Sequence, residues 1–178
     1  MTIRLKNFIE QHIELIDSND FAECYKLLEG SPDKLLAAEF TKVMLDLGIN
    51  PLTYLDYVPT NFARGSKLED ITIPSNIKYI STLAFYQSKK LKHVVVSEGV
   101  TTVGQQAFEK CHKNCHFVLP ESLTSVNEWA FSLMENITIE YNGTKKQFKE
   151  LINKSRYVFD HTFYTCTCLD GVIEKKRR

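Results

Sequence analysis

The amino-acid sequence predicts an α+β solenoid of 23-residue coils with a parallel sheet, a helical N-terminal cap, and a C-terminal cap made of a helix and a strand. Two observations support this fold class. Ala-Phe pairs recur at a constant step of 23 residues and begin at Ala84, Ala107 and Ala130. Apolar residues keep the same step in four further columns: Ile71, Val94 and Phe117; Ile73, Val96 and Leu119; Ile77, Val100 and Leu123; and Ile80, Val103 and Val126. Such a period is typical of stacked coils that bury a shared core.

Residues 1–55 are predicted to form the helical N-terminal cap. Apolar residues recur at helical spacing in two stretches, from Leu5 to Ile16 and from Leu35 to Leu47, and a shorter helix with Phe21, Tyr25 and Leu28 lies between them. Ser31-Pro32 is typical of an N-cap followed by proline at the first helical position, and Gly48 is typical of the left-handed residue that ends a helix. Two interpretations remain open: a cap over the edge of the first coil, or a separate binding domain.

The repeats are predicted to cover residues 56–141. Within each repeat, apolar and polar residues alternate with period two near the end, as expected of a strand with one buried face, and Pro74 and Pro120 are expected to end two of these strands. Tyr57 and Phe62 stand 23 residues before Ile80 and Phe85, which predicts a half repeat upstream. Ile139 and Tyr141 stand 22 residues after Phe117 and Leu119, which predicts a one-residue deletion in the last repeat.

Residues 142–178 are predicted to form the C-terminal cap with a basic tail. A helix from about Thr144 to Asn153 would place Phe148, Leu151 and Ile152 on one face, and Phe163 to Cys168 has the pattern of a strand. Asp170-Gly171 is a turn signal. The tail from Glu174 to Arg178 is expected to be solvated, and a nucleic-acid contact is the alternative.

The pattern Ile-x-Ile-Pro-x-x-Ile-x-x-Ile-x-x-x-Ala-Phe, which begins at Ile71, resembles the BspA-like leucine-rich repeat. The resemblance covers roughly residues 57–168 and implies a short, right-handed leucine-rich-repeat solenoid. Gly48-Ile-Asn-Pro-Leu ahead of the repeats is similar to short intracellular forms encoded by tailed phages and bacteria. One departure is that Ser81 and Asn127 occupy the position of Gly104 in the other coils.

Composition excludes several classes of protein. The 22 basic and 22 acidic residues give zero net charge, so no global field attracts nucleic acid or an anionic membrane. Apolar runs are too short for a membrane span, and the N-terminal residues lack a secretory h-region, which predicts a cytoplasmic protein, in the host cytoplasm if phage-encoded. Five cysteines are then expected as free thiols.

The cluster of Cys111, His112, Cys115 and His116 offers residues that could bind zinc. Cys111, however, occupies the repeat position of Ser88 and Met134, a core position, and Cys115 begins the next buried strand, so the ligands should point to different faces. Cys166 and Cys168 lack the usual spacing of metal or redox motifs, and alternation directs both to one side. No phosphate loop, nucleophile elbow or paired-carboxylate motif occurs, so we predict neither an enzyme nor a cofactor, metal or small-molecule substrate.

The concave sheet face is the predicted partner-binding site. Strand alternation and the 23-residue step predict two exposed rows: Asp70, His93, His116 and Thr138, and beside them Thr72, Val95, Val118 and Glu140. His93 and His116 are expected to stack. A strip of valines and imidazoles would suit a protein partner, although valine could equally be present for strand propensity.

The sequence therefore predicts a non-enzymatic protein-binding module, an intracellular adaptor or inhibitor that acts on a host protein. The alternative is a nucleic-acid-associated protein that uses the basic C-terminal tail. Salt-dependent binding would distinguish this alternative.

Overall fold

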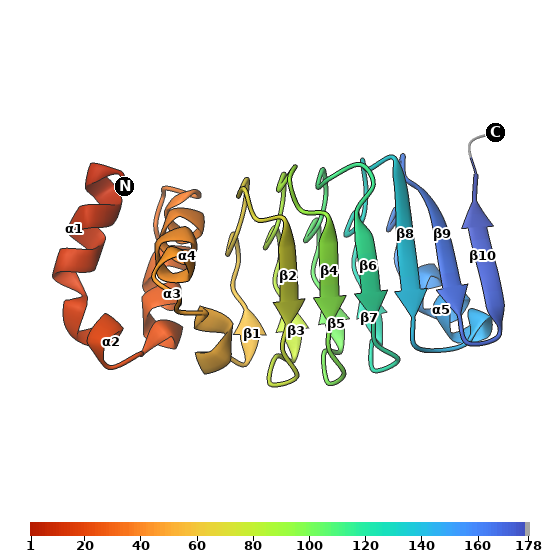
Figure 1. The fold of residues 1–178 in the computed structure, drawn as a ribbon, viewed down its shortest axis with the longest axis horizontal. Coiled ribbons are helices and arrows are strands. Elements are labelled where there is room, and N and C mark those ends of the chain that lie inside the picture. Colours follow the sequence, from red (N-terminus) through yellow and green to blue (C-terminus); the bar gives the residue numbers. More distant parts are fainter. Residues whose placement is uncertain (177–178) are drawn as a thin grey trace.

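The computed structural model describes residues 1–176 and confirms the predicted solenoid (Figure 1). Helices lie at the N-terminal end, and strands of successive coils stand side by side toward the C-terminal end. The helical elements are α1 (Ile3–Gln11), α2 (Ile13–Asp17), α3 (Phe21–Glu29), α4 (Leu36–Asp46), the 3-10 helix η1 (Pro51–Tyr54) and α5 (Lys145–Asn153).

Two sheets wrap the core, and we name them the front and back sheets. The front sheet consists of β2 (Asp70–Ile73), β4 (His93–Val96), β6 (His116–Leu119), β8 (Asn136–Tyr141), β9 (Phe163–Cys168) and β10 (Gly171–Lys175). The back sheet consists of β1 (Tyr57–Val58), β3 (Tyr79–Ile80), β5 (Thr102–Val103) and β7 (Ser125–Val126). All pairs are parallel except β9 with β10. The back sheet was not predicted, because two-residue strands carry too little alternation to be recognised.

A column of phenylalanine rings fills the space between the sheets. Phe108 is fully buried, and its ring lies parallel to those of Phe85 and Phe131, with centroids 5.0 and 5.6 Å away. Phe159 continues the stack 5.3 Å beyond Phe131. The predicted one-residue deletion in the last repeat is confirmed, because Phe117 pairs with Ile139 in the front sheet.

The predicted alignment of the first coil is wrong by one residue. Val58, not Tyr57, pairs with Ile80, so the step here is 22 residues. The N–H of Ala63 donates to the carbonyl of Ala84, just as the N–H of Phe85 donates to that of Ala107. Ala63 therefore occupies the backbone position of Phe85, and the first coil carries the pair in the reversed order Phe62-Ala63.

Each coil has two residues in the left-handed region, four positions apart. The pairs are Asn61 and Gly65, Leu83 and Gln87, Gln106 and Lys110, Trp129 and Leu133, and Tyr157 and His161. Only one of the ten is glycine, although this region is unfavourable for other residues. Hydrogen bonds to the next coil hold the backbone there; the N–H of Gln87, for example, donates to the carbonyl of Glu109 at 2.9 Å.

The N-terminal helices pack aromatic side chains against the first coil. Tyr25 of α3 is fully buried, its ring lies 5.5 Å from that of Phe62, and its hydroxyl lies 2.5 Å from the Thr41 Oγ1 atom of α4.

The predicted start of α4, the last of the N-terminal helices, is wrong. Asp33 follows Ser31-Pro32 and accepts the N–H of Leu35 in a turn, so α4 begins at Leu36 without a side-chain cap. Its predicted end is confirmed, since Gly48 has φ +79°.

The C-terminal helix and strand are confirmed. Thr144 and Gln147 form a reciprocal capping box at the start of α5, and β9 has the predicted bounds. The tail departs from the prediction, because Glu174 and Lys175 belong to β10 and Lys175 Nζ donates to the Phe159 carbonyl at 2.6 Å. Arg177 and Arg178, the rest of the predicted tail, lie outside the described residues.

Candidate functional site

The outer face of the front sheet carries the two predicted rows in the predicted register. The first row runs Asp70, His93, His116 and Thr138, and the second runs Thr72, Val95, Val118 and Glu140. The strands align these side chains because each pair of neighbours is directly opposed in a parallel ladder. All eight are exposed or half-buried, whereas the residues between them face the core.

Both rows continue onto strands that the sequence did not place in this sheet. Thr165 and Thr167 of β9 pair with Thr138 and Glu140, and Glu174 and Val172 of β10 pair with those threonines in turn. The alternation of β9 was visible in the sequence, but a strand pattern alone does not reveal which neighbour it pairs with. The candidate surface therefore spans six strands instead of four.

The first row is polar and internally hydrogen-bonded. His116 Nδ1 lies 2.8 Å from Thr138 Oγ1, and His116 Nε2 lies 3.5 Å from a carboxylate oxygen of Glu140. The expected stacking of the histidines is wrong, because the rings of His93 and His116 meet edge to face at 63° with centroids 6.1 Å apart. The hydrogen bond to Thr138 constrains the orientation of the His116 ring.

The second row places apolar side chains in the middle of this polar surface. Val95 is 37% exposed, and Val118 beside it is half-buried. Thr72 and Glu140 flank the two valines in the same row. The result is a small apolar centre with a polar surround, an arrangement found in protein–protein interfaces.

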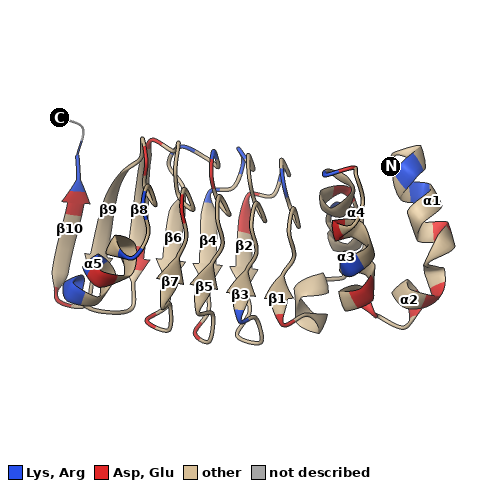
Figure 2. Ribbon diagram, turned by 180° about the vertical axis from the view of Figure 1, so that it is seen from behind, with Lys and Arg blue, Asp and Glu red and all other residues tan. Residues whose placement is uncertain are grey.

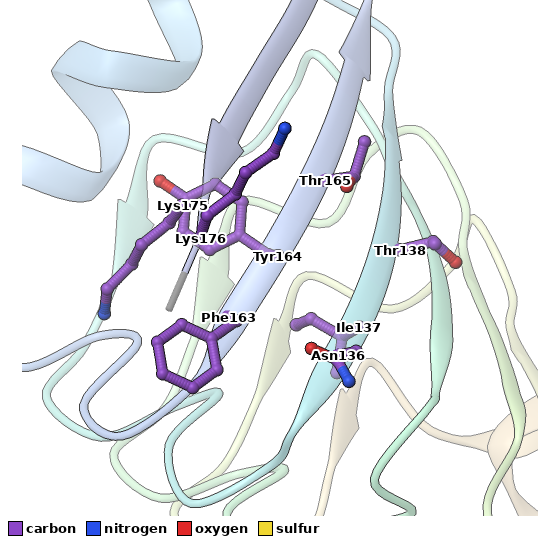
Figure 3. A pocket seen from close by; sticks show the side chains of 8 residues that line it. All are labelled: Asn136, Ile137, Thr138, Phe163, Tyr164, Thr165, Lys175 and Lys176. Carbon is purple, nitrogen blue, oxygen red and sulfur yellow. The ribbon is translucent and has the colours of Figure 1, made fainter. Parts of the chain in front are cut away.

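A shallow pocket of about 190 Å³ lies at the C-terminal end of this face (Figure 3). Side chains of β8 and β9, including Thr138, Phe163 and Thr165, line it together with Lys175 and Lys176. The two lysine side chains extend in different directions (Figure 3). Lys176 pairs with Glu174 at 2.6 Å, so the described lysines of the predicted basic tail are already engaged by the protein.

The cysteine–histidine cluster is divided between the core and the surface. Cys111 and Cys115 are buried, whereas His112 and His116 lie on the outside. Burial, aided by the Asp70 charge, raises the pKa of the Cys115 thiol to about 12, so this group is protonated at neutral pH. Within residues 1–176, no three His, Cys, Asp or Glu residues are grouped so that they could hold a metal ion.

The second pair of cysteines has the predicted geometry. Cys166 and Cys168 point to the same side of β9 into the core, with sulfur atoms 3.7 Å apart. Burial, with a contribution from the Cys168 charge, raises the pKa of Cys166. Such a thiol is a poor nucleophile at neutral pH.

Comparison with known proteins identifies the repeat. The family model described as the BspA type leucine rich repeat region matches residues 57–173 in 6 copies. No curated protein and no solved structure resembles the chain closely enough to count as a match. None of the helices in the described part of the chain has both the length and the apolar character needed to cross a membrane.

Proposed function

The chain belongs to the BspA-type leucine-rich repeat family, and on this basis we propose that it is a non-enzymatic module that binds a protein through the outer face of the front sheet. Leucine-rich repeats are commonly protein-interaction modules, and their solenoid is typically a binding scaffold. The proposed contact residues are those of the two rows: Asp70, Thr72, His93, Val95, His116, Val118, Thr138 and Glu140.

One observation carries this proposal: Val95 and Val118 lie side by side, accessible to solvent, at the centre of a polar strip. A partner would bury these valines and form hydrogen bonds with the histidines and threonines around them. The parallel ladder fixes their spacing before binding, so little conformational freedom is lost on association.

We further propose that the partner is a host protein and that the module acts inside the cell as an adaptor or inhibitor. This part of the proposal rests on the similarity of Gly48-Ile-Asn-Pro-Leu and the short repeat array to intracellular forms from tailed phages and bacteria. Binding would then block or redirect the partner.

The test begins with affinity capture from a host lysate and continues with the captured protein in purified form. The variant Val95→Glu/Val118→Glu places two like charges on the strip and leaves the core unchanged, so the fold should persist and the partner's Kd should rise at least tenfold. The matched control is Thr102→Glu/Ser125→Glu, which places the same charges on paired residues of the back sheet.

Undiminished binding by the valine variant would contradict the proposed surface. Equal loss of binding in both variants would also contradict it, because charge alone would then explain the effect. Failure to recover any stoichiometric partner under several conditions would count against a protein-binding function.

A further inference from the structure

The two edges of the solenoid differ in charge. We define the upper edge as the loops that lead into the front strands β2, β4, β6 and β8, residues 64–69, 87–92, 110–115 and 133–135. The lower edge consists of the loops that follow β2, β4 and β6, residues 74–78, 97–101 and 120–124. The upper edge carries two acids, Glu69 and Glu135, and these basic residues: Arg64, Lys67, Lys89, Lys90, Lys92, Lys110 and Lys113. The charged residues of the lower edge are Lys78, Glu98 and Glu121. Figure 2 shows basic segments along the upper loops, with acidic segments among them near β6 and β8, and acidic segments below β5 and β7.

The acids of the lower edge bind one coil to the next. The Glu98 carboxylate accepts the N–H groups of Glu121 and Ser122 at 3.0 and 3.2 Å. Burial alone would raise the pKa of Glu98, but these hydrogen bonds outweigh it and lower the pKa. Glu121 in turn accepts a hydrogen bond from Gln147 of α5 at 2.7 Å. These charges therefore have a structural role.

Several cations of the upper edge have no such role. Lys92 pairs with Glu69 at 2.7 Å, and Lys110 lies 3.3 Å from the largely buried Glu109. Lys113 lies 4.0 Å from Glu135, and both of these side chains are exposed. Within the described part of the chain, Lys67, Lys89 and Lys90 form no ion pair. Like charges on adjacent coils repel one another, and this repulsion opposes folding slightly. The lysines also leave a positive electrostatic potential on this edge.

A hollow of about 410 Å³ opens among these cations. Lys89, Lys110 and Lys113 line it together with His112 and Leu133, whose side chain is 44% exposed. The hollow thus combines ammonium groups with one accessible apolar side chain. A ligand that matches it carries several carboxylates close to an apolar group.

The aromatic ring beside these loops is already covered by cations. Arg64 Cζ and Lys110 Nζ lie 4.9 and 5.3 Å from the centre of the Tyr86 ring, and Lys110 also donates to the Tyr86 hydroxyl at 3.0 Å. Single-stranded nucleic acid usually stacks its bases on open aromatic faces. Glu69 and Glu135 lie near the two ends of the basic loops, which keeps the basic strip short. Both features favour a short acidic peptide over nucleic acid.

We propose that the upper edge binds an acidic segment of a protein partner, with the carboxylates at Lys89, Lys90 and Lys113 and an apolar side chain against Leu133. This inference rests on the proposed protein-binding function and names the chemistry of the partner. The upper edge adjoins the first row, since Lys92 directly precedes His93 in β4. One partner could therefore contact both surfaces.

The test uses a fluorescein-labelled 12-residue peptide of Glu-Glu-Leu repeats and the full chain, with fluorescence anisotropy as the readout. We expect saturable binding at low salt that weakens as salt rises, and no binding of a peptide with glutamine in place of glutamate. The variant Lys89→Gln/Lys90→Gln/Lys113→Gln should bind at least tenfold more weakly. The control Lys6→Gln/Lys146→Gln/Lys149→Gln removes the same charge from exposed helix positions and should bind like the wild type.

Two results would overturn the proposal: absence of peptide binding at low salt, and an equal affinity of the upper-edge variant and the wild type. A labelled twelve-nucleotide oligothymidylate provides the other arm, and tighter binding of that probe than of the peptide would assign the edge to nucleic acid instead. The Val95→Glu/Val118→Glu variant should still bind the peptide. Failure of the front-face proposal is therefore distinguishable from failure of this one.

Discussion

The first coil and the interior coils contain the same residue types but align them differently. In the interior, Phe85, Phe108 and Phe131 follow at 23-residue steps, and neighbouring rings lie within 3° of parallel. In the first coil the backbone step is 22, the pair is reversed, and the Phe62 ring meets Phe85 at 68° with centroids 6.0 Å apart. The spacing in the sequence predicts that Phe62 takes the phenylalanine position of the repeat. The backbone hydrogen bonds show that Phe62 occupies the alanine position instead.

The difference shows what each coil packs against. An interior coil has a similar coil on both sides, so identical side chains stack directly. The first coil has a coil on one side and α3 on the other, and Phe62 contacts both the Phe85 ring and the Tyr25 ring. The alignment of the first coil therefore places Phe62 in contact with a coil on one side and with α3 on the other.

The largest expected effect comes from removing the N-terminal helices that pack against the first coil. Deletion of residues 1–48 would expose Phe62 and Val58, both fully buried in the intact chain. Because exposed apolar surface and an uncovered coil promote association, the truncated protein should aggregate. Size-exclusion chromatography with light scattering measures this. A soluble, monomeric truncation would show that the repeats fold without the helices.

The next largest effect is expected inside the phenylalanine column. Phe108→Ala leaves a cavity between Phe85 and Phe131 and should lower the free energy of unfolding by about 3–5 kcal/mol. The control Lys149→Ala changes an exposed residue of α5 and should stay within about 0.5 kcal/mol of the wild type. Urea denaturation of both variants provides the measurement. A loss below about 1 kcal/mol for Phe108→Ala would contradict the stacked core.

The interior repeat was predictable because one physical constraint recurs in it. Each coil must bury side chains at the same backbone positions, so Ile80, Val103 and Val126 record the period directly in the sequence. The same logic predicted the rows of the candidate site, where Val95 and Val118 lie as expected. That these residues bind a partner stays a prediction.

The ends were less predictable because unique contacts replace the repeat there. The place of β9 in the front sheet and the start of α4 depend on tertiary packing that no period records. The charge difference between the edges could not be predicted from the net charge, because the basic and acidic residues cancel and the loops of the two edges alternate along the chain. The coiling gathers most of the basic residues of these loops on one edge.

A single position tests how closely the interior coils approach each other. A methyl group on Gly104 would lie 2.7 Å from backbone atoms of Ile80, Ser81 and Thr82. Gly104→Ala should therefore destabilise the protein by about 1–3 kcal/mol, the usual cost of overpacking. Ser81→Ala changes the same repeat position in a coil that already accommodates a side chain, and it should cost less than about 0.5 kcal/mol. Equal effects of the two substitutions would contradict this close approach.

The smallest expected effect compares the first coil with the second at one left-handed position. Gly65 in the first coil and Gln87 in the second have φ angles of +65° and +60°. Gln87 is exposed and forms no side-chain hydrogen bond within the described residues, and the space around Gly65 is open. Steric strain is thus the main difference between glycine and glutamine at either position.

Reciprocal substitutions at these positions should change stability in opposite directions. Gln87→Gly relieves strain in the folded state but frees the unfolded chain, so the net gain should be about 0.5–1 kcal/mol. Gly65→Gln should lose a similar amount. Thermal and urea denaturation of both variants and of the double variant provide the test. Because the two residues lie in adjacent coils, a double variant that matches the wild type would show that each coil meets the same backbone requirement, whereas a loss in both single variants would mean that Gln87 makes a stabilising contact.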